Sequence, residues 1–576
     1  MPSKLSGFAA VISVLAIPFI ANLFFVARST LYCLSNDSFT ITTLNQTAPR
    51  ASCFRVRDGI FREVLAERPR FSFEKVNYID GHVLPGIIES HGHILQYGEM
   101  LESVSLYGAT SIDEVRKRVQ DFLKIHKSDG YGSREKWVRG IGWDQAFFGG
   151  VMPTAEELKF DEDLYIMLDR VDVHCVWVSE EVLNLLPNPL PEAPPGGVIV
   201  TDPGPGVFCD NAMDEIVFPQ APKPTIEDKT RWFRTAMSEL NKVGIVGVGD
   251  AGMRPTDVQI LESMAEEGEL TIRINVMLEC PERNTYCPDD TKDLKILGGN
   301  SLGSSSLMLG GVKLFGDGAL GSWGAALLEP YSDKAETSGT MLINETQLTE
   351  VVKQWYNAGF QVNVHAIGDR ANRAAVDAFE NVLGTDCEGC NEVRRLRIEH
   401  AQIIHPDDQI RIERMGIIPS IQPTHATSDM AYASTRLGTS RISQSAYRMS
   451  SLFPSKMGSK YPGPVLGSDF PVEPPNPFHG MYAAVTRLSP ATGTSPSGEG
   501  GWQPEQKLSL QQALLGFTRN GAYGWLKENE TGAIEVGKWA DWVVIDTDFW
   551  ADATGESLRD LIVKETWLNG KRVYKL

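Results

Sequence analysis

The order of the apolar segments constrains the fold of this 576-residue chain more than any other feature. Strand-like runs made almost entirely of apolar residues alternate with helical stretches such as 349–359 and 370–384. Strands this apolar are typical of parallel strands covered on both faces, and repeated strand–helix units build a parallel sheet. With at least seven such units, a closed (β/α)8 barrel is favoured over an open sheet. The strand candidates are residues 244–252, 271–279, 307–318, 359–369, 396–402, 415–423 and 464–471.

Both sides of this region are β-rich. Residues 39–84 contain short strand-like runs with a turn at 57–59 (RDG), and the C-terminal part has a strong hairpin turn at 569–570 (NG). Small β-segments at opposite ends of a chain commonly combine into one unit. We therefore expect an α/β protein, with a TIM (β/α)8 barrel over residues 85–504 and a small β-sandwich built from residues 39–84 and 505–576.

The N-terminal segment carries no charge from residue 7 to residue 26, which is just long enough to cross a bilayer of about 30 Å as a helix. We expect residues 1–30 to be a signal anchor, which is a transmembrane helix, or a cleaved signal peptide; a buried N-terminal hydrophobic helix is the alternative. Either favoured interpretation sends the chain into the secretory pathway, membrane-anchored or secreted. Four sequons agree with that route and indicate a glycoprotein: Asn36, Asn45, Asn344 and Asn529.

The eight cysteines suit the same compartment, because they are an even number. Cys280 and Cys287, and likewise Cys387 and Cys390, are close enough in sequence to pair, although spacing alone does not fix the connectivity. Cys175 lies in an apolar run and is expected to be a buried thiol.

The charge balance excludes one class of partner. The chain has 54 Lys+Arg against 74 Asp+Glu, a net charge of −20, and no compact basic cluster. Proteins that bind a phosphate backbone need a basic face. We therefore expect no nucleic-acid partner.

Histidines and one aspartate stand at the ends of the apolar runs. His91 and His93 (SHGH) are two residues apart, so in a strand both side chains point to the same face. His365 and His400 end two further runs, and Asp469 ends a late one. Barrel active sites are built at the carboxyl ends of the strands, where all five residues would lie. Imidazole and carboxylate ligands without thiolate suit zinc, or another divalent ion such as manganese or iron.

Lys313 lies inside the otherwise apolar run LMLGGVKLFGDG. It needs a partner, because burying a bare ammonium group is costly. Two interpretations remain open. The lysine pairs with a nearby carboxylate such as Asp317, or its amine has reacted with carbon dioxide and the carbamate bridges two metal ions held by the histidines.

With these residues in place, the chain resembles the amidohydrolase superfamily, in the amidohydrolase-3 group of N-substituted formamide deformylase-like and YtcJ-like proteins. The resemblance runs from about residue 40 to the C-terminus, whose segment TGAIEVGKWADWVVID is similar to the one that completes the β-sandwich of such enzymes. It implies a metal-dependent-hydrolase barrel. The motifs that carry it are VLPGIIESHGHIL, GWDQAFFGG…MPT, GVKLFGDGALGS, VHAIGDRA, RIEHAQ and GSDFPVEPPNP.

The resemblance also implies roles for individual residues. The HxH pair and Asp469 would bind the more buried metal, His365 and His400 the second, and a carbamylated Lys313 would bridge them. Asp469 would in addition act as the catalytic general base. The implied ligands of one or two divalent ions, with zinc expected, are His91, His93, Lys313, His365, His400 and Asp469.

Five further residues are candidates for supporting roles. Trp143 in GWDQ and His174 in VDVHCVWV match family positions near the substrate, although a buried Trp and a core histidine are equally open. His425, near the next strand end, is a third candidate substrate contact. Asp317 and Asp369 follow ligand-bearing strands and are expected to orient metal-binding groups.

The leading functional hypothesis is a metal-dependent hydrolase that cleaves a non-peptide C–N bond, an amide or formamide of a small molecule, through a metal-activated water. A mononuclear-metal deaminase on the same fold and a catalytically silent barrel that binds a ligand are the alternatives. Deaminases of this superfamily lack the bridging lysine, so GVKLFGDG argues against deamination. The expected partners are a small-molecule amide and, if the N-terminal segment is uncleaved, a membrane.

Overall fold

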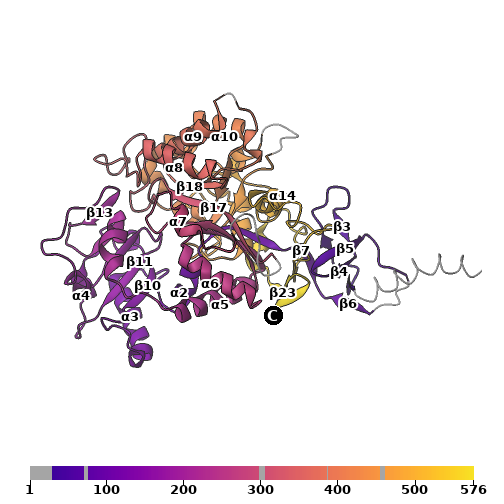
Figure 1. Cartoon of the computed structure of the whole chain (residues 1–576), viewed down its shortest axis with the longest axis horizontal. Helices are drawn as coiled ribbons and strands as arrows, with labels where there is room; N and C mark the ends of the chain where they lie inside the picture. Colours follow the sequence, from indigo (N-terminus) through magenta and orange to yellow (C-terminus); the bar gives the residue numbers. More distant parts are fainter. Residues whose placement is uncertain (1–28, 71–74, 297–304, 386, 455–460) are drawn as a thin grey trace, which may run out of the picture.

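The computed structural model describes residues 29–70, 75–296, 305–385, 387–454 and 461–576. Within them the chain forms a central parallel sheet, a second sheet inserted early in the chain, and two smaller sheets that pack on each other. In Figure 1 the inserted part lies to the left of the central sheet and the N-terminal strands lie to the right. The central sheet therefore stands between two accessory parts.

The central sheet has eight parallel strands in the order β21-β20-β19-β18-β17-β16-β15-β8. Their residues are covered on both faces, and every residue of β16, for example, is buried. This arrangement confirms the predicted barrel of parallel strands. The strands are β8 (Ile87–Gly92), β15 (Ile245–Met253), β16 (Arg273–Leu278), β17 (Leu307–Phe315), β18 (Val362–Ala366), β19 (Arg397–His400), β20 (Ile418–Ile421) and β21 (Val465–Leu466).

The last strand returns to the first just beyond β21. The amide of Asp469 donates to the carbonyl of His91 over 2.8 Å, and the amide of His93 donates to the carbonyl of Phe470 over 2.8 Å. Gly467 permits this approach, because a Cβ there would lie 2.2 Å from Glu89 Oε1. These backbone bonds bring the two ends of the barrel sheet together at their carboxyl ends.

Helices follow the strands and pack apolar faces on them in one large core. Side chains that begin the helices accept backbone amides: Thr225 Oγ1 accepts from Asp228 before α5, and Asn344 Oδ1 accepts from Gln347 before α8. Apart from two helices of the inserted part, the helices after β8 are α2 (Ile94–Leu101), α5 (Ile226–Lys242), α6 (Pro255–Glu266), α7 (Pro288–Thr291), α8 (Glu345–Asn357), α9 (Asp369–Leu383), α10 (Pro406–Met415), α11 (Pro423–Asp429), α12 (Ala433–Gln444), α13 (Pro477–Thr486), α14 (Leu510–Gly516) and α15 (Arg519–Gly524).

Two smaller sheets pack on each other, and the six-stranded one combines strands from both ends of the chain. β7 pairs antiparallel with β22, and the rings of Tyr32 and Trp542 meet in the core between the sheets at 5.2 Å. The expected turns at 57–59 and 569–570 are confirmed, since each joins two antiparallel strands. In sheet order, the four-stranded sheet contains β5 (Ile60–Leu65), β4 (Cys53–Arg57), β1 (Thr30–Leu34) and β6 (Val76–Ile79). The six-stranded sheet contains β24 (Lys571–Lys575), β23 (Val563–Leu568), β22 (Trp542–Ile545), β7 (His82–Pro85), β2 (Ile41–Thr42) and β3 (Arg50–Ala51). The domain boundaries expected from the sequence, 39–84 and 505–576 for the sandwich and 85–504 for the barrel, stay a prediction.

A separate six-stranded sheet lies between β8 and β15 in the chain. It has its own core around Trp143 and Trp177 and was not anticipated, because its short strands were not distinguished from loops in the sequence. Its helices are α3 (Ile112–His126) and α4 (Glu180–Leu183). In sheet order the strands are β13 (Gly197–Val200), β14 (Val207–Asp210), β12 (Cys175–Val178), β11 (Ile166–Arg170), β10 (Val138–Trp143) and β9 (Val104–Ser105).

All eight cysteines lie in the described part of the chain and form four disulfides. The two pairings that were open from spacing are present, Cys280–Cys287 and Cys387–Cys390. The expectation of a buried thiol at Cys175 was wrong, because β12 and β14 are antiparallel and place Cys209 opposite it. The fourth disulfide joins β1 to β4, Cys33 to Cys53.

The prediction of a transmembrane signal anchor is corrected. Among the described residues no helix is long and apolar enough to cross a membrane. Apart from its last two residues, the predicted segment 1–30 lies outside the described part of the chain. Thr30, its last residue, begins strand β1, which pairs with two other strands. We therefore do not propose a membrane helix or a membrane partner for this protein.

A buried ion pair joins the barrel to the sandwich and gives a test of the fold. Arg273 at the start of β16 bonds to both oxygens of Asp541, at 2.7 and 3.0 Å, and both residues are buried. We expect Arg273→Ala to lower the free energy of unfolding by about 3–5 kcal/mol, because it leaves the Asp541 carboxylate buried without its partner. Arg234→Ala, which removes an exposed pair with Glu269, should cost less than about 1 kcal/mol. Denaturant titration of the two variants checks both values, and equal losses would contradict the assignment.

Candidate metal centre

A cavity of about 690 Å3 opens at the carboxyl ends of the barrel strands. Its floor is made by side chains of the predicted ligand set, and one wall belongs to the inserted sheet, which contributes His174 and Asp210. The ligand candidates that line it are His91, His93, Lys313, His365, His400 and Asp469. The structure thus brings together residues that are up to 378 positions apart in the sequence, from His91 to Asp469.

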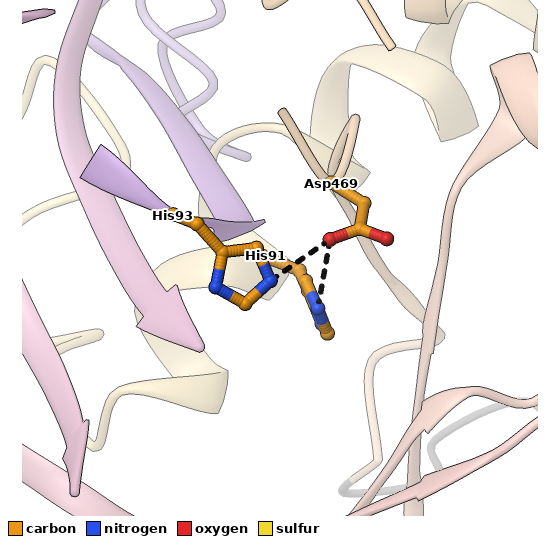
Figure 2. Close-up of side chains that lie close together, drawn as sticks. All are labelled: His91, His93 and Asp469. Carbon is orange, nitrogen blue, oxygen red and sulfur yellow. Dashed lines mark ion pairs between the residues drawn. The ribbon is translucent and has the colours of Figure 1, made fainter. Parts of the chain in front are cut away.

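Three of these side chains converge on one carboxylate oxygen. His91 Nε2 lies 3.2 Å and His93 Nε2 3.1 Å from Asp469 Oδ1, and these three residues are one group whose donor atoms all lie within 4.8 Å. Figure 2 shows both imidazoles directed at the carboxylate. Asp469 has a φ of 61°, in the left-handed region that non-glycine residues rarely adopt and that is frequent at functional sites. The backbone conformation of Asp469 and the two imidazole contacts thus fix the position of its carboxylate.

The second nitrogen of His91 is fixed by a buried carboxylate. His91 Nδ1 lies 2.6 Å from Glu399 Oε2, and both side chains are fully buried. Arg397 pairs with the same carboxylate over 2.9 Å and donates to the carbonyl of Ser90. An anionic Glu399 accepts a hydrogen bond from Nδ1–H of His91, which keeps the proton on Nδ1 and leaves the lone pair on Nε2 directed at Asp469.

His365 and His400 lie beside this trio. Their ring centroids are 4.3 Å apart, and the His400 ring is 4.9 Å from that of His91. Burial holds the pKa of both imidazoles well below the ordinary value, so both are neutral near pH 7 and can offer a lone pair. His400, like Asp469, has a positive φ, of 72°.

Lys313 is buried in β17 and faces the same cavity. Its Nζ donates to the carbonyl of Ala251 over 3.3 Å. Burial lowers the pKa of its ammonium group, although Glu399 and Asp469 act in the opposite direction. Asp317, the suggested ion-pair partner, instead accepts three backbone amides, from Ala326, Ile367 and Gly368.

The donor set fits a divalent metal ion. Buried polar atoms in native proteins are almost always hydrogen-bonded. Here five buried atoms of the site make no hydrogen bond to the described part of the chain, and they belong to five different side chains. Imidazole nitrogens beside a carboxylate are the ligands that zinc and similar ions prefer. The five atoms are His91 Nε2, His365 Nε2, His400 Nδ1, His425 Nε2 and Asp469 Oδ1.

His174 belongs to the inserted part and lines the cavity. Its Nδ1 lies 2.8 Å from Asp210 Oδ1, and its ring is 5.4 Å from that of His365. The Asp210 carboxylate rests against the barrel at Gly318, where a Cβ would lie 2.8 Å from both oxygens. The disulfide between the next residue, Cys175, and Cys209 joins the two strands that carry the pair. His174 therefore has the position expected of a substrate contact.

The other candidates do not reach the cavity. Trp143 is fully buried in the inserted sheet, and its Nε1–H donates to the carbonyl of Leu168. Asp369 begins α9 and accepts the amide of Leu328. Asp317 lies close to a ligand candidate, with Oδ1 3.6 Å from His365 Nε2, and burial raises its pKa to about 7. His425 lies next to His400 but is not among the described residues that line the cavity.

Three supporting residues of the site were missed in the sequence. Glu399 and Arg397 stand in the motif RIEHAQ beside His400, and only the histidine was selected. The sequence could have indicated both residues, because two opposite charges inside a short apolar strand are expected to pair with each other. Glu89, in the strand before His91, is a similar case: it is fully buried and accepts the amides of His91 and Ser468.

Comparison with known proteins agrees with this geometry. The model of the amidohydrolase family matches residues 79–574. The chain belongs to the amidohydrolase family. It is 29% identical to Protein LONG AFTER FAR-RED 3 of Arabidopsis thaliana, covering 93% of this chain and 90% of that protein. It is 27% identical to Putative amidohydrolase YtcJ of Bacillus subtilis (strain 168), over 93% and 98%, and 24% identical to N-substituted formamide deformylase of Arthrobacter pascens, over 86% and 88%.

A solved structure of a metal-dependent hydrolase has a similar fold. The crystal structure of an uncharacterized metal-dependent hydrolase from Pyrococcus horikoshii OT3 superposes with a TM-score of 0.71 and 26% identity, covering 92% of this chain and 99% of that one. The resemblance stated from the motifs is confirmed, and this amidohydrolase is a hydrolase.

The contact between His91 and Glu399 gives the test of this centre. Glu399→Gln should weaken divalent-metal binding by about 10–100-fold, because a neutral amide no longer fixes the proton on Nδ1 of His91. Glu350→Gln, an exposed position on α8, is the matched control and should leave the affinity unchanged. Competition with a chromophoric chelator measures the affinity. Equal affinities for wild type and Glu399→Gln would contradict the role assigned to Glu399.

Proposed function

We propose that this amidohydrolase cleaves an amide or formamide C–N bond of a small molecule, releasing a carboxylate and an amine. The observation that carries the proposal is the convergence of two imidazole nitrogens, of His91 and His93, on Oδ1 of the buried Asp469. These three residues would hold a divalent ion, for which zinc is our choice from the nitrogen and oxygen donors. When bound, such an ion supplies a Lewis acid that polarises a carbonyl and lowers the pKa of a water molecule.

Asp469 is the proposed general base. Burial raises its pKa, but the neighbouring His91, His93 and His400 outweigh this effect and hold the pKa well below the ordinary value. The carboxylate is therefore ionised at neutral pH and can accept a proton from the attacking water. It can then pass that proton to the leaving nitrogen, which departs as a neutral amine.

The rest of the cavity supports a small, partly apolar substrate. Met213, Phe218, Trp232 and Phe315 line it together with the polar residues. A volume of about 690 Å3 lies in the range of small-molecule sites. His174, fixed through Nδ1 by Asp210, would hydrogen-bond the substrate from the wall that the inserted sheet contributes.

Lys313 favours hydrolysis over deamination. It is buried in the cavity wall with His365 and His400, and its charge has no hydrogen-bonded carboxylate among the described residues. A carbamate on Lys313 would supply an anion at this place. We keep that modification as part of the proposal.

We also propose that the protein folds in an oxidising compartment, as the secretory pathway would provide. Four disulfides support this, because such bonds persist where thiols are not kept reduced. Non-reducing peptide mapping of protein isolated from its source should find all four pairs, and free thiols at these positions would contradict the proposal.

The test of the proposed function is Asp469→Asn. We expect hydrolysis of the best substrate from a panel of N-substituted formamides and N-acyl amines to fall by about 100–10,000-fold, because the amide cannot accept the proton of the attacking water. Release of amine and carboxylate is measured together, and circular dichroism checks the fold of each variant.

Asp163→Asn, at an exposed position of the inserted part, is the matched control and should retain full activity. Removal of metal by a chelator should abolish hydrolysis, and added zinc or manganese should restore it. Release of ammonia without a carboxylate would instead indicate deamination, and undiminished hydrolysis by Asp469→Asn would contradict the role of Asp469.

A further inference from the structure

The turn that carries His174 is strained. Residues 171–174 join β11 to β12 of the inserted sheet, and three of them, Asp172, Val173 and His174, line the cavity. Val173 has a φ of 54°, in the left-handed region, which is an outlier for a β-branched residue. Backbone strain of this kind persists only where the surrounding structure fixes it. The position of His174 in the cavity wall therefore depends on the contacts that hold this turn.

The carboxylate of Asp172 fixes the turn. Its Oδ1 accepts the amide of His174 over 3.2 Å, and its Oδ2 accepts hydrogen bonds from Arg170 and from Ser322 Oγ, the latter over 3.2 Å. The amide of Val173 donates to the carbonyl of Arg170 over 2.9 Å. Arg170 and Ser322 thus hold the carboxylate that orients the backbone of His174.

Arg170 is the centre of a buried polar cluster. Its side chain is 1% exposed, and the residue is not among the described residues that line the cavity. Besides its bond to Asp172, the guanidinium donates from Nε to Gln145 Oε1 and from Nη2 to Asp144 Oδ1, both over 2.7 Å. Asp144 and Gln145 belong to the motif GWDQ. This motif therefore supplies two of the side chains that fix Arg170.

The loop after β17 leaves room for this cluster. Its sequence is GDGALGSWG, and Gly318, Gly321 and Gly324 stand three residues apart in it; we call these three the glycine strip. A Cβ at Gly321 would lie 3.1 Å from two nitrogens of Arg170, and a Cβ at Gly318 or Gly324 would lie 2.8 or 3.1 Å from a carboxylate oxygen of Asp210. Each glycine of the strip thus lets a charged side chain of the inserted part approach the barrel backbone.

Hydrogen bonds join the cluster to the glycine strip. Gln145 Nε2 donates to the carbonyl of Gly321 over 3.3 Å, and Arg436 of α12 donates to the same carbonyl over 3.1 Å. The strip follows β17, the strand that carries Lys313. The turn with His174 is therefore placed relative to a segment that also contributes a ligand candidate.

We propose that Arg170 is a positioning residue of the active site. Through Asp172 it holds the strained turn against the glycine strip, and it thereby sets the place of His174 relative to the metal centre. Its charge is balanced by Asp144 and Asp172, so the guanidinium is engaged within the protein and acts on the substrate through His174. The inference rests on the proposed function, because it concerns the substrate contact assigned to His174.

The first test is Arg170→Lys, which keeps the charge but cannot reproduce the three directed hydrogen bonds of the guanidinium. We expect KM for the best substrate of the panel to rise by about 10-fold or more and kcat to change by less than about threefold, because His174 no longer meets the substrate. Metal content should equal that of wild type. Arg134→Lys, at an exposed position of the inserted part, is the matched control and should keep the wild-type KM.

Two further variants separate positioning from a merely structural role. Arg170→Lys combined with His174→Ala should have the KM of His174→Ala alone, because residues that act through one another are not additive. Gly321→Val keeps Arg170 and its partners but places a side chain against the guanidinium, so it should raise KM in the same way. Circular dichroism spectra equal to wild type show that these effects do not come from unfolding.

Crystal structures of wild type and Arg170→Lys test the inference without a substrate. We expect Val173 to leave the left-handed region in the variant and the imidazole of His174 to shift by about 1 Å or more, which is enough to impair a positioned contact. An unmoved His174, an unchanged KM in both Arg170→Lys and Gly321→Val, or additive effects in the double variant would overturn the inference. A wild type that hydrolyses no member of the panel would contradict the proposed function, whereas the position of His174 in the two structures would still decide this inference.

Discussion

The backbone bond between Asp469 and His91 is the constraint on which the rest of the site depends. The amide of Asp469 donates to the carbonyl of His91 over 2.8 Å, and this joins the last strand of the barrel sheet to the first. It also places the carboxylate of Asp469 opposite the two imidazoles of the HxH pair. Closure of the sheet and the geometry of the candidate metal centre therefore depend on the same contact, and a change that separates β21 from β8 would remove both.

Buried carboxylates fix the positions of the strand ends. Glu89 accepts the amides of His91 and Ser468, one on each side of the barrel closure, and its pKa is raised to about 7 by burial. Asp317 accepts three backbone amides beyond β17 and β18. Glu399 joins the imidazole of His91 to the guanidinium of Arg397. In each case an acidic group satisfies amides or cations that would otherwise be buried without a partner.

Much of the barrel could be predicted from the sequence, because parallel strands covered on both faces leave near-continuous apolar runs. The same runs end at the histidines and at Asp469, so the sequence could name residues that line the cavity at the carboxyl ends of the strands. The inserted sheet could not be found in this way. Its strands are short and partly antiparallel, and the disulfide between Cys175 and Cys209 depends on a strand pairing that the spacing of the cysteines does not reveal.

The sequence was also insufficient for interactions between side chains on different strands. Trp143 occupies a family motif, but its position in a fully buried core depends on Leu168 of the adjacent strand β11 and on Trp177 of β12, one strand further. Glu399 was passed over because its partner, His91, is 308 residues away. His425 was assigned to the substrate because it follows a strand end, whereas its contacts are with His400 and Asp469. Position along a strand predicts the end of the barrel at which a side chain lies, but not which atom it faces.

The most direct test of the account is a crystal structure with anomalous diffraction data collected at the absorption edge of the metal, from crystals grown with zinc or manganese. The account predicts an anomalous peak at coordination distance, about 2.0–2.2 Å, from the facing nitrogens of His91 and His93 and from Asp469. Well-ordered crystals without a peak between these three residues, or with the metal bound elsewhere in the chain, would contradict it.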